Sequence, residues 1–268
     1  MHEHNNNLYT VITGASQGLG KALAYECASR DMNLVLISLP NEGLYNLQKE
    51  IMSTYHVSVR VFEADLTVRT SINRLVLQLQ NFSINMLINN AGCGGSFSIE
   101  KVPLQLIEAI IELNIRAPVY LCCKLLPELA RHQKSYILNV SSIMSQYPAA
   151  YKTVYPASKA FIFSFSCGLR EELKDTNVKV SVLVPGGMMT NKRVAKQMKG
   201  HGILARLSIV DTDWVAKAAV DGLLSGKSVI VPGLLNKLSW HLMHLFPLRL
   251  GMPLISRFNR NELQRNER

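Results

Sequence analysis

Tyr155 and Lys159 are the residues whose types and spacing most clearly suggest chemistry. Tyrosine has a reference pKa of about 10, so a protein that uses it near neutral pH must stabilise the phenolate. Residues four apart on a helix share a face, which would place the Lys159 ammonium beside the Tyr155 hydroxyl. At about 4 Å and an effective dielectric of about 20, their attraction is on the order of 4 kcal/mol, or about three pKa units before desolvation is subtracted. The spacing therefore predicts a phenol acidic enough to exchange protons near neutral pH.

A glycine-rich turn near the start of the sequence predicts a dinucleotide-binding site. It follows an expected strand, 9–13, and precedes a helical pattern over 19–30. Glycine lets the backbone approach a pyrophosphate closely, and the free N–H groups and the helix dipole attract its charge. The residues expected to contact the cofactor here are Gly14, Ser16, Gln17, Gly18, Leu19 and Gly20.

The elements that must position these groups alternate between short β-branched runs and helical stretches, the pattern of parallel βαβ units. Strands are expected over 9–13, 34–38, 58–62, 86–89, 136–140, 179–184 and 228–231. Helices are expected over 19–30, 44–55, 71–79, 104–130, 153–175, 214–224 and part of the tail. The fold class is therefore α/β, with a doubly wound, mostly parallel seven-stranded Rossmann-type sheet and helices on both faces. We expect one domain: residues 1–232 form the dinucleotide-binding and catalytic body, with 188–208 as a substrate lid, and 233–268 form a helical C-terminal extension.

Together these motifs resemble the short-chain dehydrogenase/reductase family over about residues 8–231. The glycine spacing of Gly14, Gly18 and Gly20 matches the family, as does Tyr155-x-x-x-Lys159. The remaining motif residues, in chain order, are Asp65-Leu66, Asn89-Asn90-Ala91-Gly92, Asn114, Ser142, Pro185-Gly186 and Thr190. In this order and spacing, the motifs are specific as a set.

The resemblance implies a role for each motif. Tyr155 would exchange a proton with the substrate oxygen, and Ser142 would hydrogen-bond that oxygen. Lys159 would lower the pKa of Tyr155 and hold the nicotinamide ribose, while Asn114 would anchor a water that relays protons outward. The residues expected to contact the cofactor beyond the glycine turn are Ser38, Leu39, Asp65, Leu66, Asn90, Ala91, Gly92, Tyr155, Lys159, Pro185, Gly186 and Thr190. The implied activity is hydride transfer between a nicotinamide cofactor and a carbonyl or secondary alcohol.

Two local features bear on the catalytic set. Pro156 follows the tyrosine and cannot donate a backbone hydrogen bond, so the helix is expected to start close to this point. Ser141 lies beside Ser142, and Ser142 is chosen because its spacing to Tyr155 matches the family.

The residues at the end of the second expected strand indicate which cofactor is preferred. An acid there grips the free ribose hydroxyl of NAD, whereas a basic residue accommodates the phosphate of NADP. The sequence has Ser38-Leu39-Pro40, which contains neither determinant. The missing acid removes a repulsion against phosphate and Ser38 could donate to it, so NADP(H) is favoured and NAD(H) stays an alternative.

The tail and the distribution of charge bear on substrate and partners. The net charge of +10 divides into +5 over residues 192–206 and +5 from residue 227 onward. This distribution fits an anionic cofactor, substrate or membrane surface, or simply a solvated basic face. Leucines recur at helical spacing after residue 234, which indicates a packed amphipathic helix, a membrane-surface helix or an acyl-chain site. With the basic lid, the tail resembles those of 3-oxoacyl and 17β-hydroxysteroid reductases, so a hydrophobic or acyl-thioester ketone is the expected substrate.

Composition argues against several other classes. The five cysteines show no paired metal-ligand spacing, so no metal site is expected and a reducing cytoplasm fits. The start lacks the apolar stretch of a secretory signal, and no segment is apolar enough to cross a bilayer. The pI of about 9.4 comes without a nucleic-acid-binding motif. A homodimer or homotetramer formed through the two long helices is expected, and a non-catalytic dinucleotide-sensing or scaffold protein is the rival function.

Overall fold

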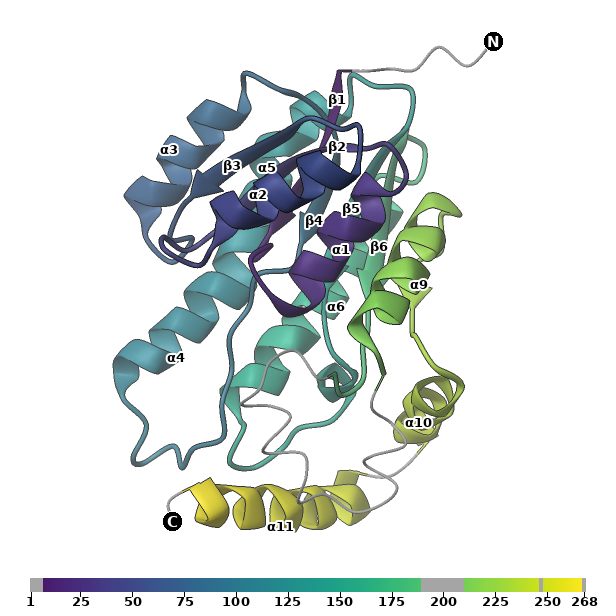
Figure 1. Ribbon diagram of the computed structural model, residues 1–268. Helices are drawn as coiled ribbons and strands as arrows, with labels where there is room; N and C mark the ends of the chain where they lie inside the picture. The colour runs from purple at the N-terminus through teal and green to yellow at the C-terminus, as the bar shows by residue number, and fades with distance from the viewer. Residues whose placement is uncertain (1–6, 189–209, 246–247, 267–268) are drawn as a thin grey trace.

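Seven parallel strands form one sheet in the computed structural model, which describes residues 7–188, 210–245 and 248–266 (Figure 1). The strands are β1 Leu8–Thr13, β2 Asn33–Ser38, β3 Val59–Glu63, β4 Ser83–Asn89, β5 Ser135–Val140, β6 Val178–Leu183 and β7 Val229–Ile230. Their order across the sheet is β3-β2-β1-β4-β5-β6-β7, and each neighbouring pair is parallel. The predicted doubly wound sheet is confirmed. The strand order reverses between β1 and β4, where open sheets bind ligands at the carboxyl ends of their strands.

Helices cover both faces of this sheet (Figure 1). They are α1 Gly18–Ala28, α2 Leu44–Thr54, α3 Arg69–Leu79, α4 Leu104–Ile111, α5 Ala117–Leu129, α6 Val154–Glu172, α9 Thr212–Leu224, α10 Leu234–Leu245 and α11 Leu248–Asn266. The described residues also form two short turns, the π-helical η1 Glu112–Arg116 and the 3-10 helix η2 Ile143–Gln146. The helix predicted over 104–130 is confirmed as the contiguous α4, η1 and α5, with the π-helical η1 as an irregular turn in its middle. Asn114 lies buried in η1 and bonds to two other segments, which offsets the cost of the irregular turn.

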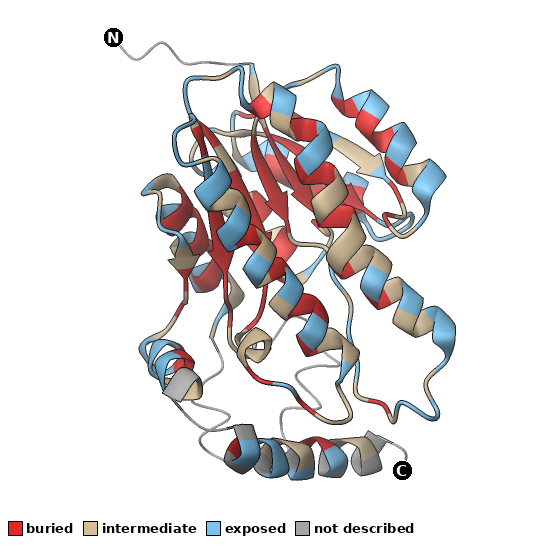
Figure 2. Cartoon of the chain, turned by 180° about the vertical axis from the view of Figure 1, so that it is seen from behind, coloured by how far each residue is buried: buried red, intermediate tan, exposed pale blue. Residues whose placement is uncertain are grey.

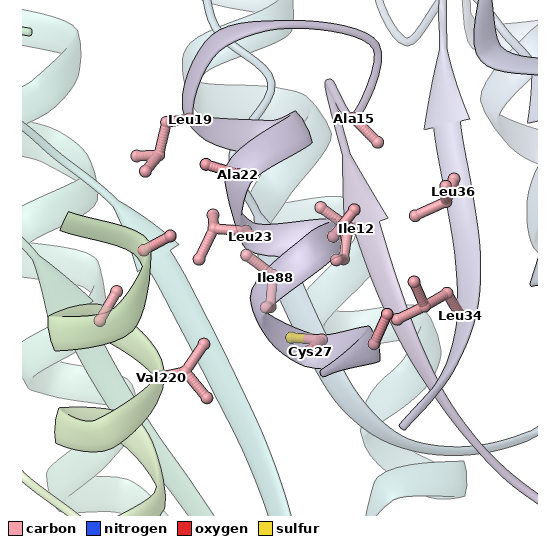
Figure 3. Packing of buried hydrophobic residues seen from close by; sticks show 14 of the residues in the cluster. Ile12, Ala15, Leu19, Ala22, Leu23, Cys27, Leu34, Leu36, Ile88 and Val220 are labelled. Atoms are coloured by element: carbon pink, nitrogen blue, oxygen red, sulfur yellow. The ribbon is translucent and has the colours of Figure 1, made fainter. Parts of the chain in front are cut away.

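Successive residues of the central strands belong to different hydrophobic clusters. Ile12 and Leu34 pack into a cluster with α1, α2 and α9, whereas Val11 and Val35 pack with α3 and α5. Figure 3 shows the first cluster, with Leu23 of α1 between Ile12 of β1 and Val220 of α9. A strand buried on both faces reads as a continuous apolar run, which is why the strands were recognisable in the sequence. Figure 2 shows the result, a buried sheet between helices whose outer faces are exposed.

The predicted C-terminal helical extension is confirmed as α10 and α11. α11 crosses the end of the molecule beneath the loops that precede α4 and α6 (Figure 1). Within the described ranges, no helix combines the length and the apolar character needed to span a bilayer. The predicted lid over 188–208 lies outside the described residues, except for Met188, which forms a parallel bridge with Val210.

Candidate active site

Tyr155 lies in the first turn of α6 and Lys159 in the second. The helix begins at Val154, so Pro156 occupies its third position. The first N–H groups of a helix have no intrahelical acceptor, which is why proline is tolerated there. The prediction that the helix starts close to Pro156 is confirmed.

The Lys159 side chain is buried and is held by the neighbouring strand. It is 5% exposed, and its Nζ donates to the carbonyl oxygen of Val140 at 2.9 Å. The same nitrogen lies 5.9 Å from the centroid of the Tyr155 ring. The lysine and the tyrosine therefore share a face of α6, and the ammonium is anchored at the end of β5.

Burial controls the pKa values of both groups. It raises the pKa of Tyr155 above its ordinary value, with the Cys93 thiol acting in the same direction and a hydrogen bond with Ser142 acting against it. Burial also lowers the pKa of Lys159 to about 8, against a smaller opposite effect of Cys93. Desolvation disfavours the charged form of each group, so the net pKa of Tyr155 lies above its ordinary value, and the lowering of that pKa by Lys159 stays a prediction.

The two neighbouring serines have different environments. Ser141 is 2% exposed and its Oγ donates to the carbonyl oxygen of Lys159 at 2.7 Å. The Oγ of Ser142 accepts from the backbone N–H of Met144 at 3.2 Å and hydrogen-bonds with Tyr155. Ser141 therefore fixes the backbone of α6, and Ser142 is the serine that faces the phenol.

Asn114 connects η1 to the loop that follows β4. Its Nδ2 donates to the carbonyl oxygen of Cys93 at 2.8 Å and to Ser158 Oγ at 3.0 Å, while its Oδ1 accepts from the N–H of Cys93 at 2.9 Å. Ser158 in turn donates to the carbonyl oxygen of Tyr155 at 2.7 Å. The Asn114 amide thus clamps the Cys93 backbone against the catalytic helix. Its predicted role as the anchor of a relay water stays a prediction, since both amide N–H groups already have acceptors.

The loop after β4 holds residues that the sequence did not single out. Cys93 acts electrostatically on both Tyr155 and Lys159, although it was not among the expected site residues. At Gly94, an added Cβ would lie 2.5 Å from the Tyr155 ring. Their position directly after the Asn-Ala-Gly motif was the available signal, because that motif must pass the catalytic helix.

The glycine turn has the backbone that a pyrophosphate site requires. Gly14 and Gly18 have φ of +65° and +54°, in the region that favours glycine. A Cβ on Gly14 would lie 2.8 Å from the Cα of Ala91, so the turn and the loop after β4 are in close contact. Helix α1 starts at Gly18 with no capping side chain and no acid in its first turn, which leaves its positive end suited to an anion.

The loop after β4 is tied directly to this turn. Asn90 Nδ2 donates to the carbonyl oxygens of Thr13 and Gly14 at 3.0 and 3.1 Å, and the N–H of Ala91 donates to Thr13 Oγ1 at 3.0 Å. A Cβ on Gly92 would lie 3.2 Å from Lys159 Nζ. These contacts join the expected phosphate turn to the catalytic lysine, so the residues present fit a nicotinamide dinucleotide laid across them.

The other expected cofactor contacts lie at or after the ends of β2, β3 and β6. Asp65 Oδ1 accepts from the N–H and the Oγ1 of Thr67, and Leu66 is buried. Ser38 is also buried and its Oγ donates to the carbonyl oxygen of Leu39 at 3.1 Å, so its expected bond to a phosphate would replace an existing one. Pro185 accepts from the N–H of Ile143 at 3.0 Å, which brings the Pro185-Gly186 segment next to Ser142. Thr190 lies outside the described residues.

Comparisons with known proteins identify relatives of this chain. The family model described as short chain dehydrogenase matches residues 9–199. The very-long-chain 3-oxoacyl-CoA reductase of Anas platyrhynchos is 35% identical over 182 residues, which cover 66% of this chain and 58% of that protein. The 17-beta-hydroxysteroid dehydrogenase type 3 of Homo sapiens is 35% identical over 185 residues, covering 68% and 59%. A short-chain dehydrogenase from Sphingobium yanoikuyae, solved in complex with NADPH, is 26% identical, with a TM-score of 0.76 over 89% of this chain and 96% of that one. The matched region thus spans about three fifths of the two curated relatives.

Proposed function

The chain belongs to the short-chain dehydrogenase family, and from that membership we propose that it is an oxidoreductase transferring hydride between a nicotinamide cofactor and a ketone or secondary alcohol. The observation that carries the proposal is the convergence of three groups on one site. Tyr155 hydrogen-bonds with Ser142, and Lys159 shares its helix face next to Gly92, in the loop that is bonded to the glycine turn.

Each side chain has a distinct task in carbonyl reduction. A bound reduced nicotinamide supplies the hydride. Tyr155, whose pKa is raised by burial, holds its proton at neutral pH and can give it to the substrate oxygen. Ser142 donates a hydrogen bond to the same oxygen and positions the carbonyl carbon. Lys159, anchored on Val140, keeps positive charge beside the ribose and the phenol below a pH of about 8.

A carbonyl panel with both reduced cofactors tests this function. We expect cofactor oxidation with a hydrophobic ketone, and its loss in Tyr155→Phe with cofactor affinity nearly unchanged. Tyr45→Phe is the matched control, because Tyr45 is 53% exposed on α2. Cofactor binding without turnover of any carbonyl would favour the rival dinucleotide-sensing function, and full turnover by Tyr155→Phe would refute the role of the phenol.

NADP(H) is the proposed cofactor. The chain carries no acid at the end of β2, where Ser38 is followed by the exposed Leu39. The relative from Sphingobium yanoikuyae was solved with NADPH, in agreement with this preference. A lower Michaelis constant for NADH than for NADPH would contradict it.

The proposed substrate is a hydrophobic or acyl-thioester ketone. The names of the relatives describe enzymes that act on very-long-chain 3-oxoacyl-CoA and on hydroxysteroids. The loops beside Tyr155 carry the buried aromatic side chains of Phe97 and Tyr147. In the panel, a long-chain 3-oxoacyl thioester and a keto steroid should have higher kcat/KM than fructose, and the reverse order would exclude this class.

Two further features belong to the same proposal, a homo-oligomer and peripheral membrane contact of a cytoplasmic protein. The membrane contact is supported by the exposed leucines on one face of α10, Leu234, Leu235, Leu238 and Leu242, beside exposed Lys237 and His241. Sedimentation with phosphatidylserine vesicles should fall in Leu238→Glu but not in Leu77→Glu, which alters an exposed leucine on α3. Light scattering gives the mass of the assembly, and a dimer lost in Leu238→Glu would assign this face to a second copy instead.

A further inference from the structure

Helix α11 contacts the segment that joins Ser142 to Tyr155. The side chain of Tyr147 packs directly on Gly251 of α11, where the space for a Cβ is filled by the tyrosine hydroxyl. Tyr147 is itself buried, at 5% exposure. This helix lies outside residues 9–199, which the family model matches, so its contacts are additional to the features that define the family.

Asn259 is the buried polar side chain in this contact. It is 3% exposed, and its Nδ2 donates to the carbonyl oxygen of Ala150 at 2.9 Å. The bond joins residues 109 apart in the sequence. A buried side-chain amide left without a partner is costly, so this bond favours one conformation of the segment.

The next residue of the segment has an unfavourable backbone that α11 also holds. Tyr151 has φ of +66°, a region that residues with a side chain rarely adopt. Its hydroxyl accepts from Arg260 Nε at 2.9 Å, and the Arg260 guanidinium lies 5.5 Å from the centroid of its ring. α11 therefore restrains both sides of the Ala150–Tyr151 peptide.

The restraint extends to the loop after β4. The carbonyl oxygen of Tyr151 accepts from the N–H of Phe97 at 2.7 Å. Three residues earlier, Gly94 lies against the Tyr155 ring. The segments around Tyr151 and Phe97 thus adjoin the part of the loop that contacts the Tyr155 ring, and α11 restrains them through Asn259 and Arg260.

We propose that Asn259 is a positioning residue, and that its bond to the Ala150 carbonyl sets the affinity for a bulky ketone substrate. The inference rests on the proposed function, since it assumes that the carbonyl binds beside Tyr155. Ser142 is held by Met144, and Lys159 by Val140, so the proton-transfer groups have supports outside α11. Loss of the Asn259 bond should therefore change KM for the ketone and leave kcat and cofactor binding nearly unaltered.

Steady-state kinetics of Asn259→Ala, with the keto steroid and NADPH, tests the proposal. We expect KM for the steroid to rise about tenfold, equivalent to about 1.4 kcal/mol. The dissociation constant of NADPH, measured by its fluorescence, should stay within about twofold of the wild-type value, and so should kcat. The reason is that the lost bond involves neither the expected cofactor contacts nor the proton-transfer groups. Arg257→Ala is the matched control, because Arg257 is exposed on the same helix.

If Asn259→Ala does not fold, substitutions of the exposed Arg260 test the same proposal. Arg260→Ala should raise KM for the steroid about threefold, and Arg260→Lys should restore part of that loss, because an ammonium can still reach the Tyr151 hydroxyl. A folded Asn259→Ala with unchanged KM, or equal changes in it and in Arg257→Ala, would overturn the proposal. Absence of ketone reduction in the wild type would instead refute the proposed function.

Discussion

Replacing Lys159 by methionine should change how the stability of the protein depends on pH. Burial lowers the pKa of this lysine from 10.5 to about 8. The difference, 10.5 − 8 = 2.5, corresponds to about 3 kcal/mol. The side chain is only 5% exposed, so solvent screens this penalty little. Carrying a charged Lys159 is therefore costly to the native state at neutral pH.

The sign follows from proton binding. Between the native pKa of about 8 and the ordinary value of 10.5, the unfolded chain binds more protons at this residue than the native one. Stability therefore rises with pH in this window, and below it both states are protonated and the dependence vanishes. From pH 7 to pH 9 the gain from Lys159 is about 1 kcal/mol, because only the upper half of that interval lies above the native pKa.

Urea unfolding followed by tryptophan fluorescence measures this gain without cofactor. The free energy of unfolding of the wild type, minus that of Lys159→Met, should increase by about 1 kcal/mol between pH 7 and pH 9. Burial raises the pKa of Cys27 and Cys122 to about 12, which lowers stability at alkaline pH, but both proteins share this effect and it cancels. Lys174→Met, which removes an exposed lysine paired with Glu171, should follow the wild type. A wild-type minus Lys159→Met difference that stays constant over this range would refute the reasoning.

Two further substitution pairs test the positioning of the catalytic groups. Ser142→Ala should lower kcat about 100-fold, as loss of a donor to a reacting oxygen does. Ser141→Ala should keep kcat and lower the free energy of unfolding by about 1–3 kcal/mol. Equal kcat values in the two variants would contradict the assignment of Ser142 as the serine that binds the substrate oxygen. Gly94→Ala should lower kcat/KM at least tenfold, because its Cβ would lie 2.5 Å from the Tyr155 ring and displace it. Gly95→Ala is its control, since that Cβ would make an ordinary 3.5 Å contact, and full activity in Gly94→Ala would show that the ring tolerates the shift.

The fold could be predicted because its strands are buried on both sides. The run from Leu34 to Ile37 has no exposed face, so its sequence is uniformly apolar and bounded by turns. The glycine turn was equally legible, because the left-handed backbone of Gly14 and Gly18 admits few other residues. Strand burial and backbone conformation restrict the residue types at individual positions, so both can be recognised in the sequence.

Contacts between distant segments could not be predicted in the same way. The π-helical turn around Asn114 depends on acceptors at Cys93 and Ser158, which no local pattern announces. Ser38 was expected to be available to a phosphate, yet its hydroxyl bonds to the carbonyl of Leu39 within a buried strand end. In both positions the residue type was informative, but the bonding partner came from tertiary structure.

The environment of Tyr155 and Lys159 could not be predicted from their spacing either, and the burial that the structure shows leads to a last prediction. Spacing placed the pair on one helix face, but burial sets the sign of each pKa change, raising that of the phenol and lowering that of the ammonium. A phenol that retains its proton is the form needed to reduce a carbonyl, whereas alcohol oxidation needs a phenolate to accept a proton. We therefore expect initial rates of ketone reduction to be nearly constant from pH 6 to pH 8, while rates of alcohol oxidation rise through this range and beyond. Rate profiles in both directions, at saturating cofactor, measure this, and an oxidation rate independent of pH would show that the phenol is not the group that exchanges the proton.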